Sequence, residues 1–332
     1  MERTILVRSI GGVSISIVIF LLLINIFNVS LNEILSFPID VLALLIILCY
    51  TRILAQDLRL HILVRYNSRV RLMLWESILI RGSSEFFALT TLPFLADEVA
   101  RTIMLVERGE SRYTAFWIAS VEMILDVLVG ASIAITSGLY ALLANHRILA
   151  SIILSIALLQ ISLAAMLLIA SSRLKSERLQ EVVDSIRQKI SIPYKLYPIF
   201  RDGAIEYSRI FNSVFSRKNM GKLTILKMLT VLVMSIPSII LFILLSGSIW
   251  LLETLLSFHA ANTFGVLPVT VGGSGLTESG LYIYMFNVLR AGSWPLTIRW
   301  RIVTYYLTLI ITASMFIYFS VRIIRKDNRG LS

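Results

Sequence analysis

Residues 228–252 read MLTVLVMSIPSIILFILLSGSIWLL and contain no charged side chain. Because a helix needs roughly 20 apolar residues to cross the hydrocarbon core of a bilayer, this stretch alone is long enough to span a membrane. Two further stretches, Ser9–Asn32 and Ile148–Ser172, also lack charge over such a length. A soluble domain rarely contains even one stretch of this kind. The sequence therefore predicts an all-α polytopic integral membrane protein.

The composition of the whole chain agrees with this prediction. Of the 332 residues, 57% are hydrophobic and 15% are charged, which is more apolar surface than one soluble core can bury. We expect a single transmembrane domain over residues 1–332, located in the cell membrane. The net charge is +11, but the basic residues flank the hydrophobic stretches, where they set topology and meet anionic headgroups. Nucleic-acid binding is therefore not expected.

The cysteine and histidine residues do not indicate a metal or cofactor site. The single cysteine, Cys49, lies inside a hydrophobic stretch, so neither a disulfide framework nor a paired thiolate site is expected. The three histidines, His61, His146 and His259, lack the spacing of metal ligands. We expect no metal and no cofactor.

Hydropathy and the distribution of Lys and Arg predict the topology. About six full spans are expected, near residues 9–28, 39–56, 114–139, 148–171, 223–247 and 301–321. Both termini are predicted to be cytoplasmic. The same side is predicted for a basic stretch that contains Arg52, Arg59, Arg65, Arg69, Arg71 and Arg81.

The loop at about residues 173–222 carries the strongest cytoplasmic signal, with eleven Lys or Arg against five acidic residues. Part of this loop shows helical spacing of apolar residues, at Leu179, Val182, Val183, Ile186 and Ile190. That spacing predicts an amphipathic helix on the membrane surface.

Residues 82–105 do not fit a simple span. They are only moderately apolar and carry four charged residues, Glu85, Asp97, Glu98 and Arg101. A single crossing would also place the following arginines, Arg108 and Arg112, on the outer side, against the charge rule. We therefore expect a re-entrant hairpin that is broken at Pro93, with its irregular backbone sheltered by neighbouring helices.

A second interrupted region covers about residues 248–298. Both of its ends are predicted to lie outside, so it needs an even number of crossings. A re-entrant pair, or two short spans that meet at Gly272–Gly275, would both satisfy this requirement.

The two interrupted regions resemble each other. Thr91–Pro93 ends in Leu-Pro and precedes an acidic helix start, and Val266–Pro268 ends in Leu-Pro before the glycine-rich loop and Glu278. The two prolines lie 175 residues apart. With one region entering from each side, this is the pattern of an inverted repeat, with halves at about residues 1–140 and 141–325.

Three short motifs carry a family resemblance: Leu92-Pro93-x4-Glu98-x2-Arg101, Glu122-x3-Asp126, and Leu267-Pro268-x4-Gly273-x-Gly275-x2-Glu278. In this order and spacing, the chain resembles the transmembrane region of lysylphosphatidylglycerol synthases over roughly Leu6 to Val321. That family also contains stand-alone flippase-like proteins. No polar stretch is long enough for the aminoacyl-transfer domain, so a stand-alone member is expected. The resemblance implies lipid handling and, in archaeal relatives, an association with lipid-linked sugar pathways.

The chain departs from the family pattern at two positions. Met123 and Thr277 stand where the pattern usually has arginine. Any headgroup recognition that depends on those arginines is therefore in question for this chain.

Glu122 and Asp126 lie four residues apart in a segment that is otherwise free of charge, so they share one helix face. A carboxylate near the bilayer centre costs about 2.5 to 3.5 kcal/mol on insertion scales, so each needs a partner. One interpretation is an interhelical ion pair with Arg101, and the other is a polar translocation path. For Arg101 itself, a local pair with Asp97 or Glu98 competes with binding of a headgroup phosphate.

The glycine-rich loop also has more than one interpretation. Gly272, Gly273, Ser274 and Gly275 precede a helix and are able to form a nest of backbone N–H groups for phosphate, or only a flexible turn. Gly-x-Ser-Gly is also a serine motif of intramembrane proteases, but the histidines all lie upstream of it. Glu278 in the first helical turn is suited to cation or proton coupling.

The leading functional hypothesis is a lipid transporter, not an enzyme, that moves a phospholipid or lipid-linked sugar between leaflets. Its expected partners are lipids with an anionic or sugar-phosphate headgroup. The expected headgroup or path residues are Glu85, Pro93, Asp97, Glu98, Arg101, Glu122, Asp126, Pro268, Gly272, Gly273, Ser274, Gly275 and Glu278. Two alternatives remain open: a membrane enzyme that acts on lipid-linked substrates, and a non-transporting scaffold partner of a glycosyltransferase.

Overall fold

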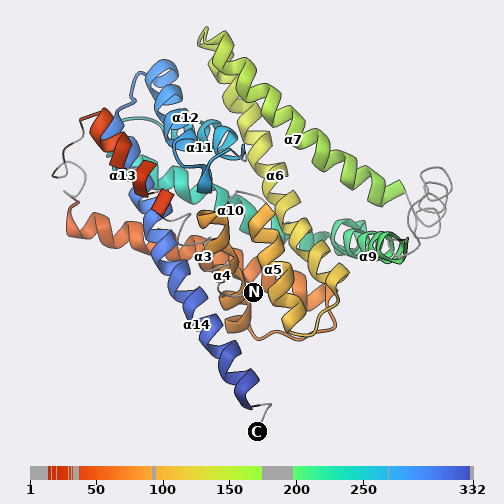
Figure 1. The fold of residues 1–332 in the computed structure, drawn as a ribbon. Helices are drawn as coiled ribbons and strands as arrows, with labels where there is room; N and C mark the ends of the chain where they lie inside the picture. The colour runs from red at the N-terminus through yellow and green to blue at the C-terminus, as the bar shows by residue number, and fades with distance from the viewer. Residues whose placement is uncertain are drawn as a thin grey trace.

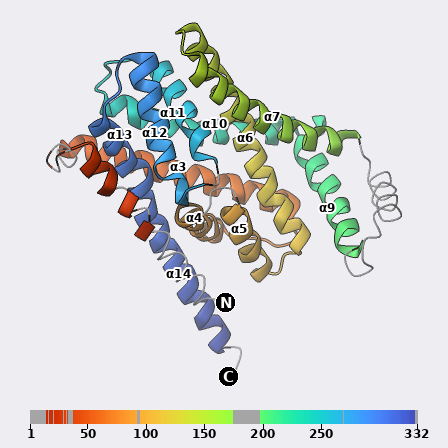
Figure 2. The same cartoon turned by 45° about the horizontal axis from the view of Figure 1, so that its top comes forward.

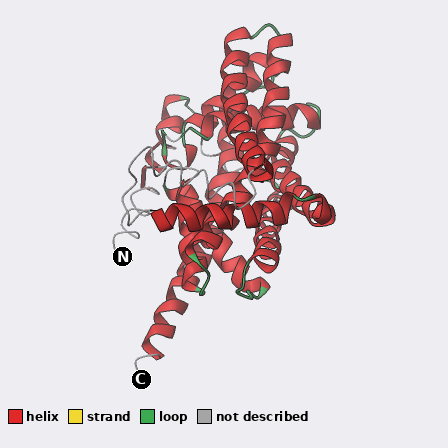
Figure 3. Ribbon diagram, turned by 90° about the vertical axis from the view of Figure 1, so that its right-hand side faces the viewer, coloured by secondary structure: helices red, strands yellow, loops and turns green. Residues whose placement is uncertain are grey.

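The computed structural model describes residues 14–15, 17–19, 21–28, 30, 32, 37–91, 95–173, 197–267 and 269–329. All regular secondary structure in these ranges is helical (Figure 3). The predicted all-α polytopic fold is confirmed.

Five helical segments of the described chain are long and apolar enough to cross a membrane. They are α3 (Ile39–Asn67), α6 (Arg112–Leu143), α7 (Arg147–Arg173), α10 (Met220–Leu244), and the continuous run of α13 (Trp294–Arg301), η4 (Ile302–Leu307) and α14 (Thr308–Arg329). Each coincides with an expected span. The expected span at 9–28 falls partly outside the described residues, but Phe27 stacks on Trp294 with ring centroids 3.7 Å apart.

Helix α3 is longer than the sequence predicted. The expected span ended near residue 56, but the helix continues to Asn67. Arg59, which was assigned to a cytoplasmic stretch, is fully buried inside it, and Arg81 is buried as well. The prediction that these two arginines face the cytoplasm was wrong, because counting charges cannot distinguish a solvated arginine from one that has a buried partner.

The first interrupted region forms two short helices, α4 (Leu74–Thr90) and α5 (Leu95–Glu107). With 17 and 13 residues, neither reaches the roughly 20 that a full crossing needs. Helix α4 begins after Met73, whose N–H donates to the Glu76 carboxylate at 3.0 Å. The chain between the two helices contains Pro93, which lies outside the described residues.

The second interrupted region also forms two short helices, α11 (Leu251–Gly265) and α12 (Leu276–Tyr284). A tight loop with the 3-10 turn η2 (Val271–Gly273) precedes α12. Gly272 and Gly273 have φ of +54° and +68°, a backbone conformation that favours glycine. The carboxylate of Glu278 accepts from the Gly275 N–H at 2.8 Å and so caps α12. Pro268 lies outside the described residues.

The helices pack in a reciprocal pattern. Helix α3 packs on α10, α4 packs on α14, and α11 packs on α6. One helix of each broken pair therefore packs against a long helix from the other half of the chain. Helices α6 and α7 run side by side, with α7 at the edge of the molecule in Figures 1 and 2. Only 17% of the most apolar window of α7 is buried, as expected for a helix that faces lipid.

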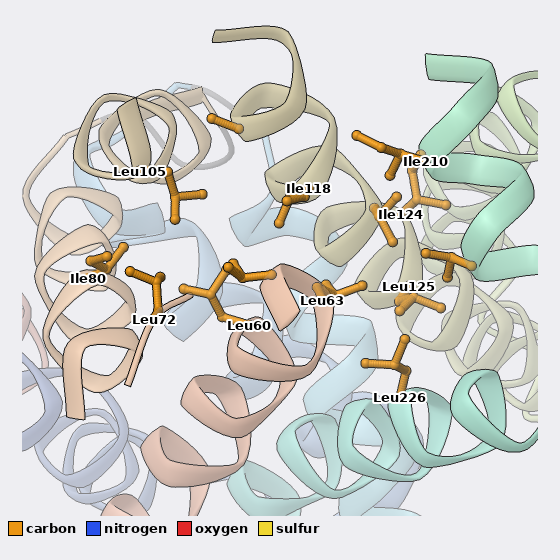
Figure 4. Packing of buried hydrophobic residues seen from close by; sticks show 14 of the residues in the cluster. Leu60, Leu63, Leu72, Ile80, Leu105, Ile118, Ile124, Leu125, Ile210 and Leu226 are labelled. Carbon is orange, nitrogen blue, oxygen red and sulfur yellow. The ribbon is translucent and has the colours of Figure 1, made fainter. Parts of the chain in front are cut away.

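The largest apolar core joins α3, α4, α6, α9 (Tyr197–Phe215) and α10. Figure 4 shows Leu60 and Leu63 of α3 close to Ile118 and Leu125 of α6, with Leu226 of α10 below them. Helix α9 is further held to α6 by the Trp117 Nε1–H, which donates to the Gly203 carbonyl at 2.8 Å. Residues 174–196 of the basic loop, which include the expected amphipathic helix at 179–190, lie outside the described residues.

Candidate functional site between two broken helix pairs

Helices α3 to α6 bury a cluster of charged side chains, which we call the charged cluster. It comprises four arginines and six carboxylates: Arg52, Arg59, Arg81, Arg101, Asp57, Glu85, Asp97, Glu98, Glu122 and Asp126. Five of the expected site residues, Glu85, Asp97, Glu98, Glu122 and Asp126, therefore lie in one cluster with Arg101.

Glu122 is the centre of the charged cluster. Its side chain is 1% exposed and contacts arginines from three other helices. Arg59 of α3 lies 2.8 Å away, and the Nε of Arg81 in α4 lies 3.3 Å away. Arg101 of α5 also donates to it, as one of the two sequence interpretations expected. One carboxylate thus ties α3, α4 and α5 to α6.

Asp126 lies one turn further along α6 and binds the same arginine as Glu122. Arg59 holds it in a two-pronged contact, in which Nη2 lies 2.9 Å from Oδ2. The same guanidinium donates to Thr230 Oγ1 of α10 at 3.0 Å. Arg59 therefore satisfies its donors with groups from two other helices, which is the arrangement that makes a buried guanidinium tolerable.

The first broken helix pair contributes its own network. Arg81 contacts Glu85 at 2.9 Å and Asp97 at 3.4 Å, so it joins α4 to α5. Arg52 of α3 lies 3.0 Å from Glu85. Arg101 pairs with Asp97, four residues earlier on α5, in addition to Glu122. The local pair and the interhelical pair of Arg101 are therefore both present.

The second broken helix pair is organised by Arg301, at the end of α13. Its Nε lies 2.9 Å from Glu278, and its Nη2 donates to the Gly272 carbonyl at 2.9 Å and to Ser274 Oγ at 3.3 Å. Its guanidinium also lies 4.1 Å from the centroid of the Tyr305 ring, in cation–π geometry. Arg301 was considered in the sequence only as a topology signal.

The expected nest at Gly272–Gly275 is occupied by the protein itself. The N–H of Gly272 donates to the Thr91 carbonyl, and that of Gly275 to Glu278. The N–H groups of Gly273 and Ser274 donate to carbonyls within the same loop. Of the two interpretations, a phosphate-binding nest and a turn, this pattern favours the turn.

Ser274 is buried, and its hydroxyl accepts from Arg301. The same guanidinium contacts Gly272 and Glu278, so Ser274 belongs to the network that Arg301 organises.

The two broken helix pairs touch each other. Besides the contact of Gly272 with Thr91 at 3.0 Å, the Tyr305 hydroxyl donates to the Leu89 carbonyl at 2.6 Å. The end of α4 thus meets both the glycine loop and the π-helical turn η4. Thr91 at the end of the first helix of one interrupted region therefore lies beside Gly272 of the other.

A cavity of about 260 Å³ lies at this meeting point. Its charged lining comes from the first broken pair and from α3, α6 and α13: Arg52, Arg81, Glu85, Asp97, Glu98, Asp126 and Arg301. The second broken pair contributes uncharged residues such as Asn262, Gly272 and Thr277. Typical pockets for drug-sized ligands are roughly 300 to 1,000 Å³, so the cavity suits a small polar group better than a whole lipid. A second cavity of about 40 Å³ adjoins it at Asp126 and reaches His259.

Met123 and Thr277 both line the larger cavity, that of about 260 Å³. These are the two positions at which the chain departs from the family pattern, and they lie on two different helices, α6 and α12.

Sequence reasoning missed Arg52, Arg59, Arg81, Asp57 and Arg301. A usable signal was present for α3, because Arg52, Gln56 and Arg59 are spaced by four and three residues and so share one helix face. Among the described residues, no group of three or more His, Cys, Asp or Glu is arranged to hold a metal ion.

One family model, described as "Lysylphosphatidylglycerol synthase TM region", matches residues 9–312. Searches of curated proteins and of solved structures found no match.

Proposed function

The chain belongs to the lysylphosphatidylglycerol synthase transmembrane-region family, and from this premise we propose that it moves a polar-headed lipid between the two leaflets. The lipid class is a phospholipid or a lipid-linked sugar. The headgroup would occupy the cavity between the broken helix pairs, while the acyl chains stay in the bilayer.

The observation that carries this proposal is the charged lining of the cavity. A polar headgroup crosses hydrocarbon only at a cost of several kcal/mol, because it leaves its hydrogen bonds with water behind. Arg52, Arg81 and Arg301 offer donors to a phosphate, and the carboxyl groups of Glu85 and Glu98 offer acceptor oxygens to hydroxyl or amine groups. Such a cavity replaces part of the lost hydration at membrane depth.

The packing supports alternating access. In the reciprocal arrangement, α4 and α14 correspond to α11 and α6. An inverted repeat with halves at about 1–140 and 141–325 accounts for this, and rocking one half against the other would open the cavity to each side in turn. In this proposal the two interrupted regions, which line the cavity, move apart when the cavity opens.

The test is lipid flip in vesicles that contain the purified full chain. Fluorescent phospholipids in the outer leaflet are bleached by a membrane-impermeant reductant, and the bleached fraction reports flip. We expect the protein to increase this fraction over protein-free vesicles, and Arg301→Gln to abolish the increase. Arg299→Gln, two residues earlier and outside the cavity lining, is the matched control.

Two outcomes would overturn the proposal. Vesicles that behave like the protein-free sample for both phospholipid and polyprenyl-phosphate sugar probes would exclude transport of either class. Release of a water-soluble headgroup would instead indicate a membrane enzyme. Mass spectrometry of lipids that co-purify with the chain identifies which probe to use.

A further inference from the structure

Two carboxylates of the charged cluster have no basic partner among the described residues. Glu85, Asp97, Glu122 and Asp126 each form at least one ion pair with an arginine. Asp57 and Glu98 form none, although both are at least nine-tenths buried.

Asp57 is the more enclosed of the two. Its exposed fraction is 0%, and neither carboxylate oxygen has a hydrogen-bond partner within the described chain. The charged groups around it are Arg81 and Glu85 of α4, Glu122 of α6, and Arg59 on its own helix. Arg59 and Arg81 already contact other carboxylates, so neither is free to neutralise Asp57.

Glu98 lies at the edge of the cavity. It is 9% exposed, it lines the cavity, and its Oε2 has no hydrogen-bond partner in the described residues. Asp97 and Arg101 on its own helix and Arg81 of α4 are its charged neighbours. The contacts of Arg101 go to Asp97 and Glu122 instead.

The charge balance of the cluster agrees with the number of carboxylates that lack a partner. Four arginines face six carboxylates, so two negative charges would remain if every carboxyl group were ionised. An unpaired buried charge costs several kcal/mol, and a buried carboxyl group avoids this cost by taking up a proton. The number of carboxylates in excess equals the number that lack a partner.

We propose that Asp57 and Glu98 are proton-binding sites, and that both carboxyl groups hold a proton in this conformation. Each site takes up one proton on a carboxylate oxygen and needs no other reactant. A metal cation would need several oxygen ligands around it, and no group of three or more His, Cys, Asp or Glu in the described residues is arranged to hold one. Glu98 exchanges its proton through the cavity, whereas Asp57 is fully buried and is not part of the cavity lining.

This arrangement couples protons to an anion in the cavity, a step that rests on the proposed function. A phosphate that binds Arg81 competes with Glu85 and Asp97 for the guanidinium. A carboxylate released in this way is left buried without a partner and takes up a proton. Binding of an anionic headgroup is therefore accompanied by proton uptake.

The test is infrared spectroscopy of the full chain in vesicles, where protonated carboxylic acids show a C=O stretching band distinct from that of carboxylates. We expect the wild-type protein to show this band at pH 7. Since two groups contribute, D57N and E98Q should each remove about half of its amplitude. D202N is the control, because Asp202 is exposed on α9, lies outside the charged cluster and should leave the band unchanged.

The wild-type spectrum needs no variant, so the test stands even if D57N fails to fold. Absence of the band in the wild-type protein at pH 7 would overturn the proposal. The same conclusion would follow if the band persisted in full in both D57N and E98Q, or if adding Na⁺ at pH 7 removed it. These outcomes do not depend on lipid flip, so failure of the transport assay would leave the proton sites standing and remove only the coupling.

Discussion

The backbone N–H of Gly272 donates to the carbonyl oxygen of Thr91 at 3.0 Å, and this contact joins the two broken helix pairs. Thr91 lies two residues before Pro93 in the first interrupted region, and Gly272 lies four residues after Pro268 in the second. Their contact joins two segments that lie far apart in the sequence, and Gly272 lines the charged cavity. Irregular backbone of this kind is tolerated at membrane depth where protein shelters it.

Substitution of Gly272 by alanine should separate the two breaks. A Cβ at this position would lie 2.6 Å from the Leu89 carbonyl oxygen and 2.7 Å from the Tyr305 ring, and the φ of +54° is unfavourable for alanine. We expect Gly272→Ala to lower the free energy of unfolding by about 2 to 5 kcal/mol, from overpacking and backbone strain together. Thermal unfolding in detergent measures this loss.

Gly109→Ala is the matched control for Gly272→Ala. Gly109 also has a positive φ, +95°, but a Cβ there would meet no atom within 4 Å. It should therefore show only the strain, about 1 to 2 kcal/mol. Equal losses in the two variants would show that the contact between the broken pairs contributes nothing.

Neutralising Glu122 should be severely destabilising. Glu122→Gln removes the one anion that Arg59, Arg81 and Arg101 share. Leaving buried arginines short of a partner costs about 3 to 5 kcal/mol, and we expect a loss of this size in thermal unfolding. Asp40→Asn, at the exposed start of α3, should change stability by less than about 0.5 kcal/mol. A mild effect of Glu122→Gln would mean that the charged cluster does not hold α3 to α6 together.

Lysine at position 301 should not preserve the function of Arg301. The guanidinium reaches Glu278, Gly272 and Ser274 at once and stacks on Tyr305, whereas an ammonium keeps the charge but loses this geometry. We expect Arg301→Lys to lower the free energy of unfolding by about 1.5 to 3 kcal/mol and to reduce lipid flip. Arg299→Lys serves as the comparison, and an equal loss there would contradict the assignment.

The attachment of α9 should depend on pH through Glu206. Burial tends to raise the pKa of Glu206, but hydrogen bonds from Arg209 and Thr114 outweigh it and hold the pKa below the usual range. A lowered pKa stabilises the folded state above about pH 4.3, the usual glutamate value, and this contribution is lost as the pH falls through the lower folded value. Amide exchange in α9, corrected for the intrinsic effect of pH, should therefore rise in acid.

Glu206→Gln should abolish this acid-dependent increase in exchange, because the glutamine side chain does not titrate. Asp202→Asn, on the exposed side of the same helix, should retain it. An unchanged pH dependence in Glu206→Gln would assign the effect to another group.

The sequence predicted most of the fold, because the properties it used act locally. Uncharged stretches located the long helices, and the charge rule together with the prolines located both interrupted regions. The length of α3 was not predictable in this way. Its last turns carry Asp57 and Arg59, which lower the hydropathy as strongly when they are buried in a pair as when they are in water.

The site was predicted only in part, for a related reason. Glu122, Asp126 and Arg101 were found because charges inside apolar segments need partners. The ion pair between Arg101 and Glu122 confirms that argument. Arg81 and Arg301 lie near ends of apolar stretches, where arginine ordinarily marks topology. Their roles depend on which helices meet in three dimensions, and that information is spread over the whole chain.

The contacts of Glu122 also have a mechanical consequence. The carboxylate of Glu122 binds guanidinium groups from three helices, so it links α3, α4, α5 and α6 into one rigid unit. Against that unit, the second broken pair is held near the cavity by neutral contacts such as those of Gly272 and Tyr305. Under thermal motion we therefore expect the contact between these two parts to loosen before the charged cluster does.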